Sequence, residues 1–512
     1  MRRLLLLLST IFIMLLLVAC SVSNILKEPE KDEDKKISGL GSSLGDDIPE
    51  AALSEDKDGG DEIDPSRLSL NKTGINLYFY DKTTEQLSPE SRTILTTRIG
   101  PEALEYVLNE LIEGPKEAEQ LVSALSKDTE IKSVEISEDI VTVDMSEKFY
   151  ESEDMALARA CLVNTILDFV NADYVKLMVE GWEATAFIDN REVMLGLLTR
   201  YPMTHTEIQA LEAQTFGNPE ISRINRELYF QDYSGKFLLP EVRSITVRNG
   251  NYAEAIINEL IKGPVSEGQG YYPTLPKGSM LHKTEIVSDE NDRNGIALYF
   301  SKEFSSKVSK GTTQEISMLS SLLYSLSSLP DIHYLNIYYD NGHGTYINAP
   351  IEKINLDRNL TVDLFPNKVG KRIRVYFGDS QGMLLVPEYR AVPKNEKNMA
   401  KRIMSELATD PIHQGCVRVI PENISPDEIK VEVKDGLAVV DIPNEYYEEL
   451  ELSENRIIRD IYAVVNTLTD PENSCYINKV QFTAEGKKID NFKDVSLSEP
   501  FVMNLALIKE EK

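Results

Sequence analysis

The sequence INLYFYDKTTEQLSPESRTI (75–94) decides the fold, because the chain contains it in three versions. RELYFQDYSGKFLLPEVRSI (226–245) and IRVYFGDSQGMLLVPEYRAV (373–392) keep the same order of parts. Each copy has an apolar strand ending in Tyr-Phe, an Asp that opens a turn, and the element Pro-Glu-x-Arg before more apolar residues. The sequence therefore predicts one module repeated three times, and each copy begins with two strands.

An amphipathic helix follows in each copy, as PEALEYVLNELIEGP (101–115), NYAEAIINELIKGP (251–264) and KNMAKRIMSELATDP (397–411). Apolar residues recur there at helical spacing. Gly-Pro ends the first two helices, because Gly suits the C-cap and Pro cannot continue a helix. The third copy has Asp410-Pro411 instead, so we expect its helix to end differently.

A hairpin of two strands, a second helix and a closing strand complete each copy. The hairpins are predicted at 131–149, 284–304 and 428–446, the second helices at 156–170, 315–329 and 457–470, and the closing strands at 174–181, 334–341 and 478–486. This order predicts an α+β fold of three tandem two-layer modules, each with two helices packed on one small sheet.

The predicted modules occupy residues 71–197, 222–357 and 370–503. The extra segments 187–220 and 345–370 are interpreted as links between modules. The first of them contains a predicted helix near 205–214.

The N-terminal residues predict a targeting signal. Arg2 and Arg3 precede an apolar run from Leu4 to Val18, and this predicts a signal peptide over 1–19. The run closes with Leu17-Val18-Ala19-Cys20, which resembles a bacterial lipobox whose Cys20 is lipidated. An ordinary signal peptide or an N-terminal anchor with a chance Cys is the alternative. Residues 20–70 are acidic and lack aromatic residues, and they predict a flexible linker between the lipid anchor and the modules.

Charge and composition exclude some function classes. The net charge of −30 predicts a surface that repels nucleic acid and anionic lipid. No Cys-x-x-Cys pair, His-Glu-x-x-His motif, Walker loop or dinucleotide glycine pattern occurs. We therefore expect no metal, no cofactor and no catalytic residue, and the protein is predicted not to be an enzyme.

Four other side chains stand out by residue type, three cysteines and the single tryptophan. Cys161 is predicted to be a core residue, because it lies on an apolar helical stretch. Cys416 and Cys475 share one module and could form a disulfide outside the cytoplasm. Trp182 is interpreted as a packing or contact residue rather than a platform for a sugar.

The Pro-Glu-x-Arg elements are the candidate site. Residues i and i+2 on a strand share a face, so each Glu and Arg can bridge to one another or to a neighbouring strand. A structural clamp is the first interpretation, a subunit interface the second and catalysis the last. The motif residues are Pro89, Glu90, Arg92, Pro240, Glu241, Arg243, Pro387, Glu388 and Arg390.

These copies resemble the GerMN domain of bacterial sporulation and germination lipoproteins of the GerM type. The resemblance rests on LYF, Pro-Glu-x-Arg, NELIEGP, VTVDMSEKF and the closing VEG, and it covers most of 75–186, 226–345 and 373–490. Three copies occur where two are more familiar. The middle copy departs from the pattern, because Tyr299 stands where Asp144 and Asp441 stand in the others.

The resemblance implies a non-enzymatic role, since such domains are similar to ring-building modules of secretion-like assemblies. In endospore formers it implies a lipid-anchored protein on the extracytoplasmic face of the membrane, between mother cell and forespore. The expected partners are other envelope or sporulation proteins, or further copies of the chain. A lipoprotein that binds peptidoglycan or a germinant is the alternative. A wall hydrolase with paired carboxylates is the third hypothesis.

Overall fold

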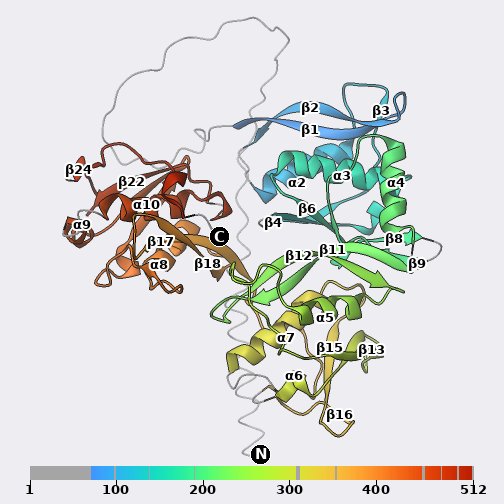
Figure 1. The fold of residues 1–512 in the computed structure, drawn as a ribbon. Coiled ribbons are helices and arrows are strands. Elements are labelled where there is room, and N and C mark those ends of the chain that lie inside the picture. Colours follow the sequence, from blue (N-terminus) through green and yellow to red (C-terminus); the bar gives the residue numbers. More distant parts are fainter. Residues whose placement is uncertain are drawn as a thin grey trace, which may run out of the picture. The chain divides into compact units, whose positions relative to one another are not determined.

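The structure is a computed structural model that describes residues 71–96, 100–137, 139–188, 191–218, 220–306, 312–351, 354–451, 456–473, 475–492 and 495–509. The predicted signal peptide 1–19, Cys20 and the predicted linker 20–70 lie outside these residues. Among the described helices, none is long and apolar enough to cross a membrane. Figure 1 shows the three modules in sequence order from blue to red.

Module 1 contains a long hairpin, two main helices and a second sheet. Its elements are β1 (Asn71–Asp81), β2 (Gln86–Thr96), α2 (Pro101–Glu113), β3 (Leu121–Val122), β4 (Ile131–Ser137), β5 (Ile140–Met145), α3 (Met155–Phe169), β6 (Tyr174–Val179), β7 (Trp182–Glu183), β8 (Thr185–Ile188), β9 (Arg191–Met194), β10 (Leu197–Leu198) and α4 (His205–Phe216). Helix α4 confirms the helix predicted near 205–214.

Modules 2 and 3 repeat this order. Module 2 contains β11 (Ile221–Gln231), β12 (Leu238–Arg248), α5 (Tyr252–Lys262), β13 (Leu281–Ser288), β14 (Asn294–Phe300), α6 (Glu303–Ser306), α7 (Thr312–Leu326), β15 (Tyr334–Asp340) and β16 (Tyr346–Ile347). Module 3 contains β17 (Gly370–Asp379), β18 (Leu385–Pro393), α8 (Met399–Leu407), β19 (Cys416–Val417), β20 (Lys430–Lys434), β21 (Leu437–Asp441), α9 (Asn444–Glu451), α10 (Ile457–Thr469), β22 (Lys479–Ala484), β23 (Lys487–Lys488), β24 (Asn491–Phe492) and β25 (Val495–Ser496).

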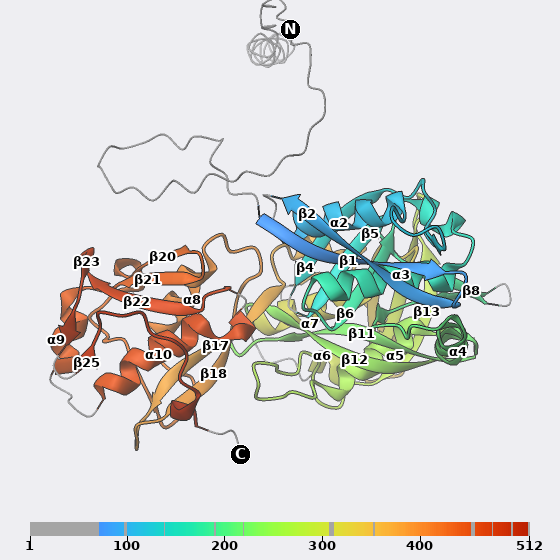
Figure 2. The same ribbon diagram turned by 90° about the horizontal axis from the view of Figure 1, so that it is seen from above.

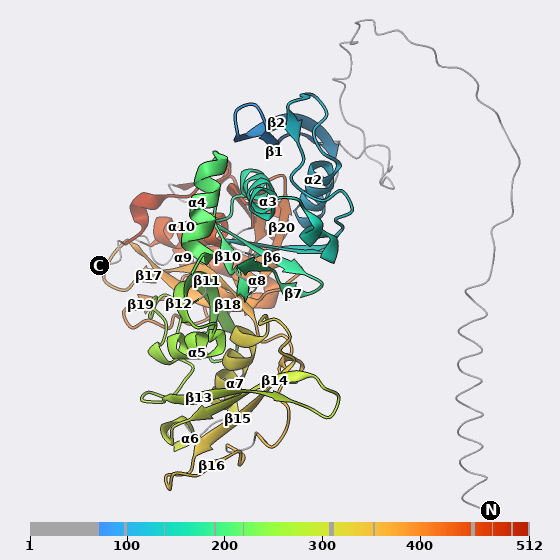
Figure 3. The ribbon, with the colours of Figure 1, turned by 90° about the vertical axis from the view of Figure 1, so that its right-hand side faces the viewer.

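The strands of each module form two separate main sheets, with the helices between them. In module 1 the hairpin β1–β2 lies on one side of α2 and α3, and the sheet β4–β5–β6 lies on the other (Figure 1). Figure 3 shows α5 and α7 between β11–β12 and β13–β15, and Figure 2 shows α8 and α10 between β17–β18 and β20–β22. The predicted layout of two helices on one sheet is therefore corrected to three layers.

The burial of the second helix gives the physical reason for this correction. Every residue of α3 from Leu157 to Ile166 is buried. A helix that covers a single sheet keeps one solvated face, whereas a helix between two sheets does not. The parallel pairing of β5 with β6 follows, because α3 crosses from the end of one strand to the start of the other.

The apolar core is continuous through modules 1 and 2 and separate in module 3. Buried residues from Ile75 to Leu360 form one cluster that Ala391 also joins, whereas those from Ile373 to Leu497 form another. The first two modules therefore share one core, and module 3 has its own.

The predicted links between modules belong to the modules themselves. We call residues 199–204, 360–369 and 501–509 the straps, because each runs back to the hairpin of its own module. In each case a backbone N–H and C=O join the strap to the start of the second hairpin strand: Leu87 N to Met203 O at 2.7 Å, Leu238 N to Lys368 O at 2.8 Å, and Lys509 N to Leu385 O at 2.8 Å. The contacts of each module thus extend beyond the predicted ends at 197, 357 and 503.

The departure of the middle copy has a structural explanation. Asp144 accepts a hydrogen bond from Gly181 N at 3.1 Å, and Asp441 accepts one from Gly486 N at 2.7 Å. Both glycines have positive φ, in tight turns. In module 2 the turn is different, and Asp340 holds it by accepting from Gly342 N at 2.7 Å. Tyr299 is therefore free of the turn and stacks on a neighbouring tyrosine.

Candidate functional site

The Glu and Arg of module 3 hold the end of helix α8 and the loop after it. Arg390 Nε donates to Glu388 Oε1 at 2.8 Å, and its Nη2 donates to the carbonyl oxygen of Asp410 at 2.5 Å. Glu388 Oε2 accepts from the N–H groups of Ile412 at 2.7 Å and His413 at 3.1 Å. One ion pair therefore joins a hairpin strand to both sides of the break after the helix.

Modules 1 and 2 repeat these contacts. Arg92 Nη2 donates to Gly114 O at 2.7 Å, and Arg243 Nη2 donates to Gly263 O at 2.5 Å. The carboxylates accept from the two N–H groups that follow the proline: Lys116 and Glu117 donate to Glu90, and Val265 and Ser266 donate to Glu241. We call these three sets of contacts the clamps.

Elementary helix chemistry explains the clamps. The last carbonyl groups of a helix have no partner within the helix, and a cation there also interacts favourably with the helix dipole. Each guanidinium also lies over the Phe of the Tyr-Phe pair on the facing strand, at 5.7 Å for Phe79, 5.1 Å for Phe230 and 4.8 Å for Phe377. The spacing of Tyr-Phe and Pro-Glu-x-Arg, which is the same in the three copies, thus places the Phe ring, the carboxylate and the guanidinium on one face of each hairpin.

The prolines lie opposite the tyrosines of the same motifs. Pro89 pairs with Tyr78, Pro240 with Tyr229 and Pro387 with Tyr376, always on the outer strand of the hairpin. Proline has no N–H and is tolerated at such an edge, where it also discourages another strand from pairing.

The clamps leave their carboxylates with little capacity for chemistry. Glu90, Glu241 and Glu388 are 5%, 8% and 0% exposed, and each accepts hydrogen bonds from an arginine and two backbone N–H groups. Within the described ranges, no group of three or more His, Cys, Asp and Glu side chains could hold a metal ion. The contacts place the Pro-Glu-x-Arg residues in their own modules.

The clamp of module 1 predicts a pH dependence of stability. Burial alone would raise the pKa of Glu90, but the N–H of Glu117, the side chain of Arg92 and the N–H of Lys116 lower this pKa below its ordinary value. The carboxylate therefore stabilises the fold fully above its ordinary pKa and loses this contribution as the pH falls through its folded pKa. We expect the stability difference between wild type and Glu90→Gln to shrink as the pH is lowered from neutral. Urea unfolding at a series of pH values measures this difference, and a constant difference would contradict the account.

A second contact repeats in all three modules and was not predicted from the sequence. In each module a hydroxyl on the second helix accepts a hydrogen bond from the N–H of the motif tyrosine: Thr165 from Tyr78 at 3.0 Å, Ser325 from Tyr229 at 3.1 Å and Thr467 from Tyr376 at 3.0 Å. The residue before each hydroxyl binds the strap, as Asn164 binds Tyr201, Tyr324 binds Phe365 and Asn466 binds Asn504. The signal was the triplet Val-Asn-Thr, which occurs in two otherwise apolar helices at 163–165 and 465–467.

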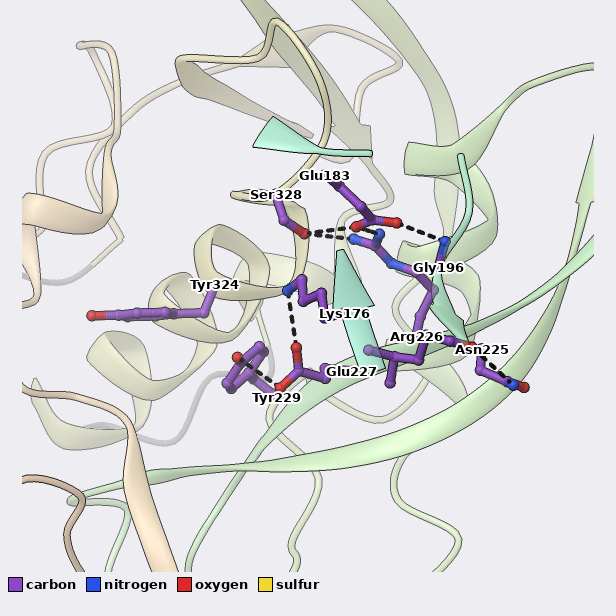
Figure 4. Close-up of a pocket in the computed structure, with 10 residues that line it drawn as sticks. Lys176, Glu183, Gly196, Asn225, Arg226, Glu227, Tyr229, Tyr324 and Ser328 are labelled. Atoms are coloured by element: carbon purple, nitrogen blue, oxygen red, sulfur yellow. Dashed lines mark hydrogen bonds and ion pairs between the residues drawn. The ribbon is translucent and has the colours of Figure 1, made fainter. Parts of the chain in front are cut away.

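A buried ion pair joins modules 1 and 2. Figure 4 shows Arg226 of β11 pointing at Glu183 of β7, and the side chains of the pair are only 4% and 1% exposed. Arg226 Nη2 also donates to Ser328 Oγ at 2.8 Å, and Glu183 Oε1 accepts from Gly196 N at 2.9 Å. The pair is therefore hydrogen-bonded on both sides, as a buried charge requires.

A second ion pair lies beside it. Lys176 Nζ lies 3.0 Å from Glu227 Oε2. Burial alone would raise the pKa of Glu227, but the ammonium of Lys176 lowers it, so the carboxylate stays charged. The cavity between the two pairs has a volume of ≈ 10 Å³, far below the roughly 300 Å³ of a small-molecule site. These residues bind modules to one another rather than a ligand.

Arg226 is a departure that the repeat itself reveals. It stands in RELYF where the other copies have Ile75 and Ile373, both buried. Comparison of the three copies position by position would have found it. Trp182 lies at the same boundary, where its ring meets that of His333 at 5.2 Å. This contact agrees with its interpretation as a contact residue.

The cysteines take simpler positions. Cys161 is fully buried, as predicted, and burial raises the pKa of its thiol. Cys416 and Cys475 are both free thiols in the structure, so the disulfide considered for them is not formed there.

Comparison with known proteins gives a consistent match. The family Germane, described as sporulation and spore germination, matches residues 76–185, 227–343 and 374–490. The tandem GerMN domains of the sporulation protein GerM from Bacillus subtilis align at 19% identity and a TM-score of 0.23, over 55% of this chain and 98% of that one. The first GerMN domain of the same protein aligns at 21% identity and a TM-score of 0.20, over 25% of this chain and 98% of that one. No curated protein matches the chain.

Proposed function

The chain belongs to the Germane family of sporulation and spore germination, with three family modules, and on this premise we propose that it is a non-catalytic assembly component of an envelope complex. In this proposal Cys20 carries a lipid anchor, and the modules lie on the extracytoplasmic face of the membrane. In a sporulating cell this places them between mother cell and forespore. The partners are other envelope or sporulation proteins, or further copies of the chain.

One observation carries the proposal. The acidic and basic residues that the repeat keeps are used within each module, where they clamp a helix end. The three modules can therefore contact other molecules through their surfaces. These surfaces include the open sheet edges at β13 and β20. Open edges and exposed sheet faces are natural sites for protein pairing.

Cross-linking in sporulating cells tests the proposal. We expect a tagged copy of the chain to be recovered in a complex with envelope proteins or with itself. A monomer without partners under the same conditions would contradict it. Incubation of the purified chain with cell wall provides a further comparison, because retention there would favour the peptidoglycan-binding alternative.

The lipid anchor has a separate test. Cys20→Ser is expected to abolish incorporation of a labelled fatty acid, because only the cysteine sulfur accepts the lipid, and to release the protein from the membrane fraction. Ser21→Ala is the matched control and should leave both unchanged. Membrane retention of Cys20→Ser without label would instead favour an N-terminal anchor.

A further inference from the structure

The outer faces of the three hairpins differ in exposure. We define the outer face of each hairpin by four equivalent positions, which lie on the face opposite to the Glu and Arg of the clamp. These positions are exposed in module 1, as Gly74, Asn76, Pro89 and Ser91. They are half-buried in module 2, as Asn225, Glu227, Pro240 and Val242, and in module 3, as Arg372, Arg374, Pro387 and Tyr389.

Both half-buried faces contact the preceding module. Asn225 of module 2 donates to Leu197 O of module 1 at 3.3 Å, next to the pair of Glu227 with Lys176. In module 3 the guanidinium of Arg372 lies over Tyr271 of module 2 at 5.3 Å. A hairpin outer face that receives another module is therefore the normal arrangement in this chain.

The second sheet of each module, which contains β6 in module 1 and β22 in module 3, also differs in what covers its outer face. In module 1 the outer sheet face, which carries Lys176, receives the hairpin of module 2. In module 3 the same face carries Gln481, which is 8% exposed and donates to Leu497 O at 2.7 Å. The segment at Leu497, just before the strap of module 3, therefore contacts this face from within the same module.

In module 2 the equivalent position is Asn336, which donates to Arg358 O at 3.3 Å, and an aromatic surface lies beside it. The ring of Tyr299 stacks on that of Tyr338 at 4.9 Å and meets the edge of Tyr346 at 5.1 Å. Tyr299 and Tyr338 are half-buried, Tyr346 is 36% exposed, and their ring contacts are to residues of module 2. We call these three residues the tyrosine face. Modules 1 and 3 have Asp144 and Asp441 in place of Tyr299, so the tyrosine face is specific to module 2.

We propose that the outer face of hairpin β1–β2 binds the tyrosine face of a second copy of the chain. The contact repeats, between copies, the pairing of hairpin with sheet that modules 2 and 1 make within one copy. Gly74 and Pro89 give a flat aliphatic surface for aromatic rings, beside Asn76 and Ser91, whose side chains are hydrogen-bonded to one another at 2.7 Å. Tyrosine is also enriched at protein interfaces.

The proposal rests on the proposed function and makes it more specific. The two faces are different surfaces, so the contact is head-to-tail and builds a ring or a filament rather than a closed dimer. The net charge of −30 opposes association at low salt, whereas tethering to one membrane favours it by raising the effective concentration.

Sedimentation of the full chain at raised ionic strength tests the proposal. We expect association that depends on concentration and that Thr93→Arg weakens by about tenfold or more, because Thr93 is exposed and pairs with Gly74 of the outer face. Thr84→Arg, in the exposed turn of the same hairpin, is the matched control and should associate as wild type does. A wild-type chain that stays monomeric, or two variants that behave alike, would overturn the proposal.

Disulfide trapping identifies the second face. In a background of Cys416→Ser and Cys475→Ser, a Thr93→Cys chain mixed with a Tyr346→Cys chain should form a mixed disulfide dimer more readily than either chain alone. Failure of this dimer overturns the pairing even if association is seen. If Thr93→Arg loses spore formation while wild type is monomeric, the face serves another protein and the proposed function still stands. If Thr93→Arg blocks association but leaves spores normal, the proposed self-association is supported. The same result would show that sporulation does not require it.

Discussion

Replacement of Glu388 by Ala is expected to lower the free energy of unfolding of module 3 by about 3–5 kcal/mol, the usual cost of removing one partner of a buried ion pair. The change leaves Arg390, whose side chain is 7% exposed, without its carboxylate. It also leaves the N–H groups of Ile412 and His413 without an acceptor. The end of α8 and the following loop should therefore loosen together.

Hydrogen exchange and far-UV circular dichroism during urea unfolding measure this effect. Fluorescence does not suit it, because the single tryptophan, Trp182, lies in module 1. Glu422→Ala, at an exposed position of module 3, is the control and should change the stability little. If Glu388→Ala kept wild-type stability but lost binding to a partner, the motif would be an interface and not a clamp.

Replacement of Arg226 by Ile is expected to destabilise modules 1 and 2 by a similar amount, about 3–5 kcal/mol, although Ile is the residue of the other two copies. The reason is Glu183, which would remain buried without a counter-charge. Adding Glu183→Gln removes that charge and should restore part of the loss. A double-mutant cycle on these two positions gives the coupling between them.

Trp182 fluorescence during urea unfolding follows this boundary directly, since the tryptophan is adjacent to Glu183 in sequence. Wild type should show one transition for modules 1 and 2, because they share a core. Ile75→Val is the matched control at the equivalent position of module 1, and it should cost only about 0.5–1.5 kcal/mol. Additive effects of Arg226→Ile and Glu183→Gln would contradict a coupled pair.

Local patterns were sufficient to predict the strands, helices and threefold repeat. Helical spacing of apolar residues identified the first helices, and Gly-Pro identified the ends of two of them, at Gly114 and Gly263. Helix α8, the first helix of module 3, ends at Leu407 with Ala408 as its C-cap. This confirms the different helix end expected from Asp410-Pro411.

Contacts between distant segments were not predictable in the same way. The pairing of a strand is set by packing, so the sequence did not show that each module has two main sheets rather than one. The straps join their hairpins through short contacts of a few residues, as at Met203 and Lys368, and a contact this short has no periodicity to detect.

The candidate site was predictable in position but not in all its partners. The repeat located Glu388 and Arg390, and strand geometry placed them on one face. That Arg390 would bind the carbonyl groups at the helix end depends on the loop after α8, whose course the sequence does not specify. Arg226 was not predictable from the shared pattern, because it stands at a position where the three copies differ.

Deletion of the gene, with microscopy of sporulation and germination, tests most directly whether the chain acts in these processes. We predict fewer mature spores or slower outgrowth, restored by the wild-type gene and restored less by the Glu388→Ala gene. A deletion strain with normal spore yield and normal outgrowth would contradict the proposed role.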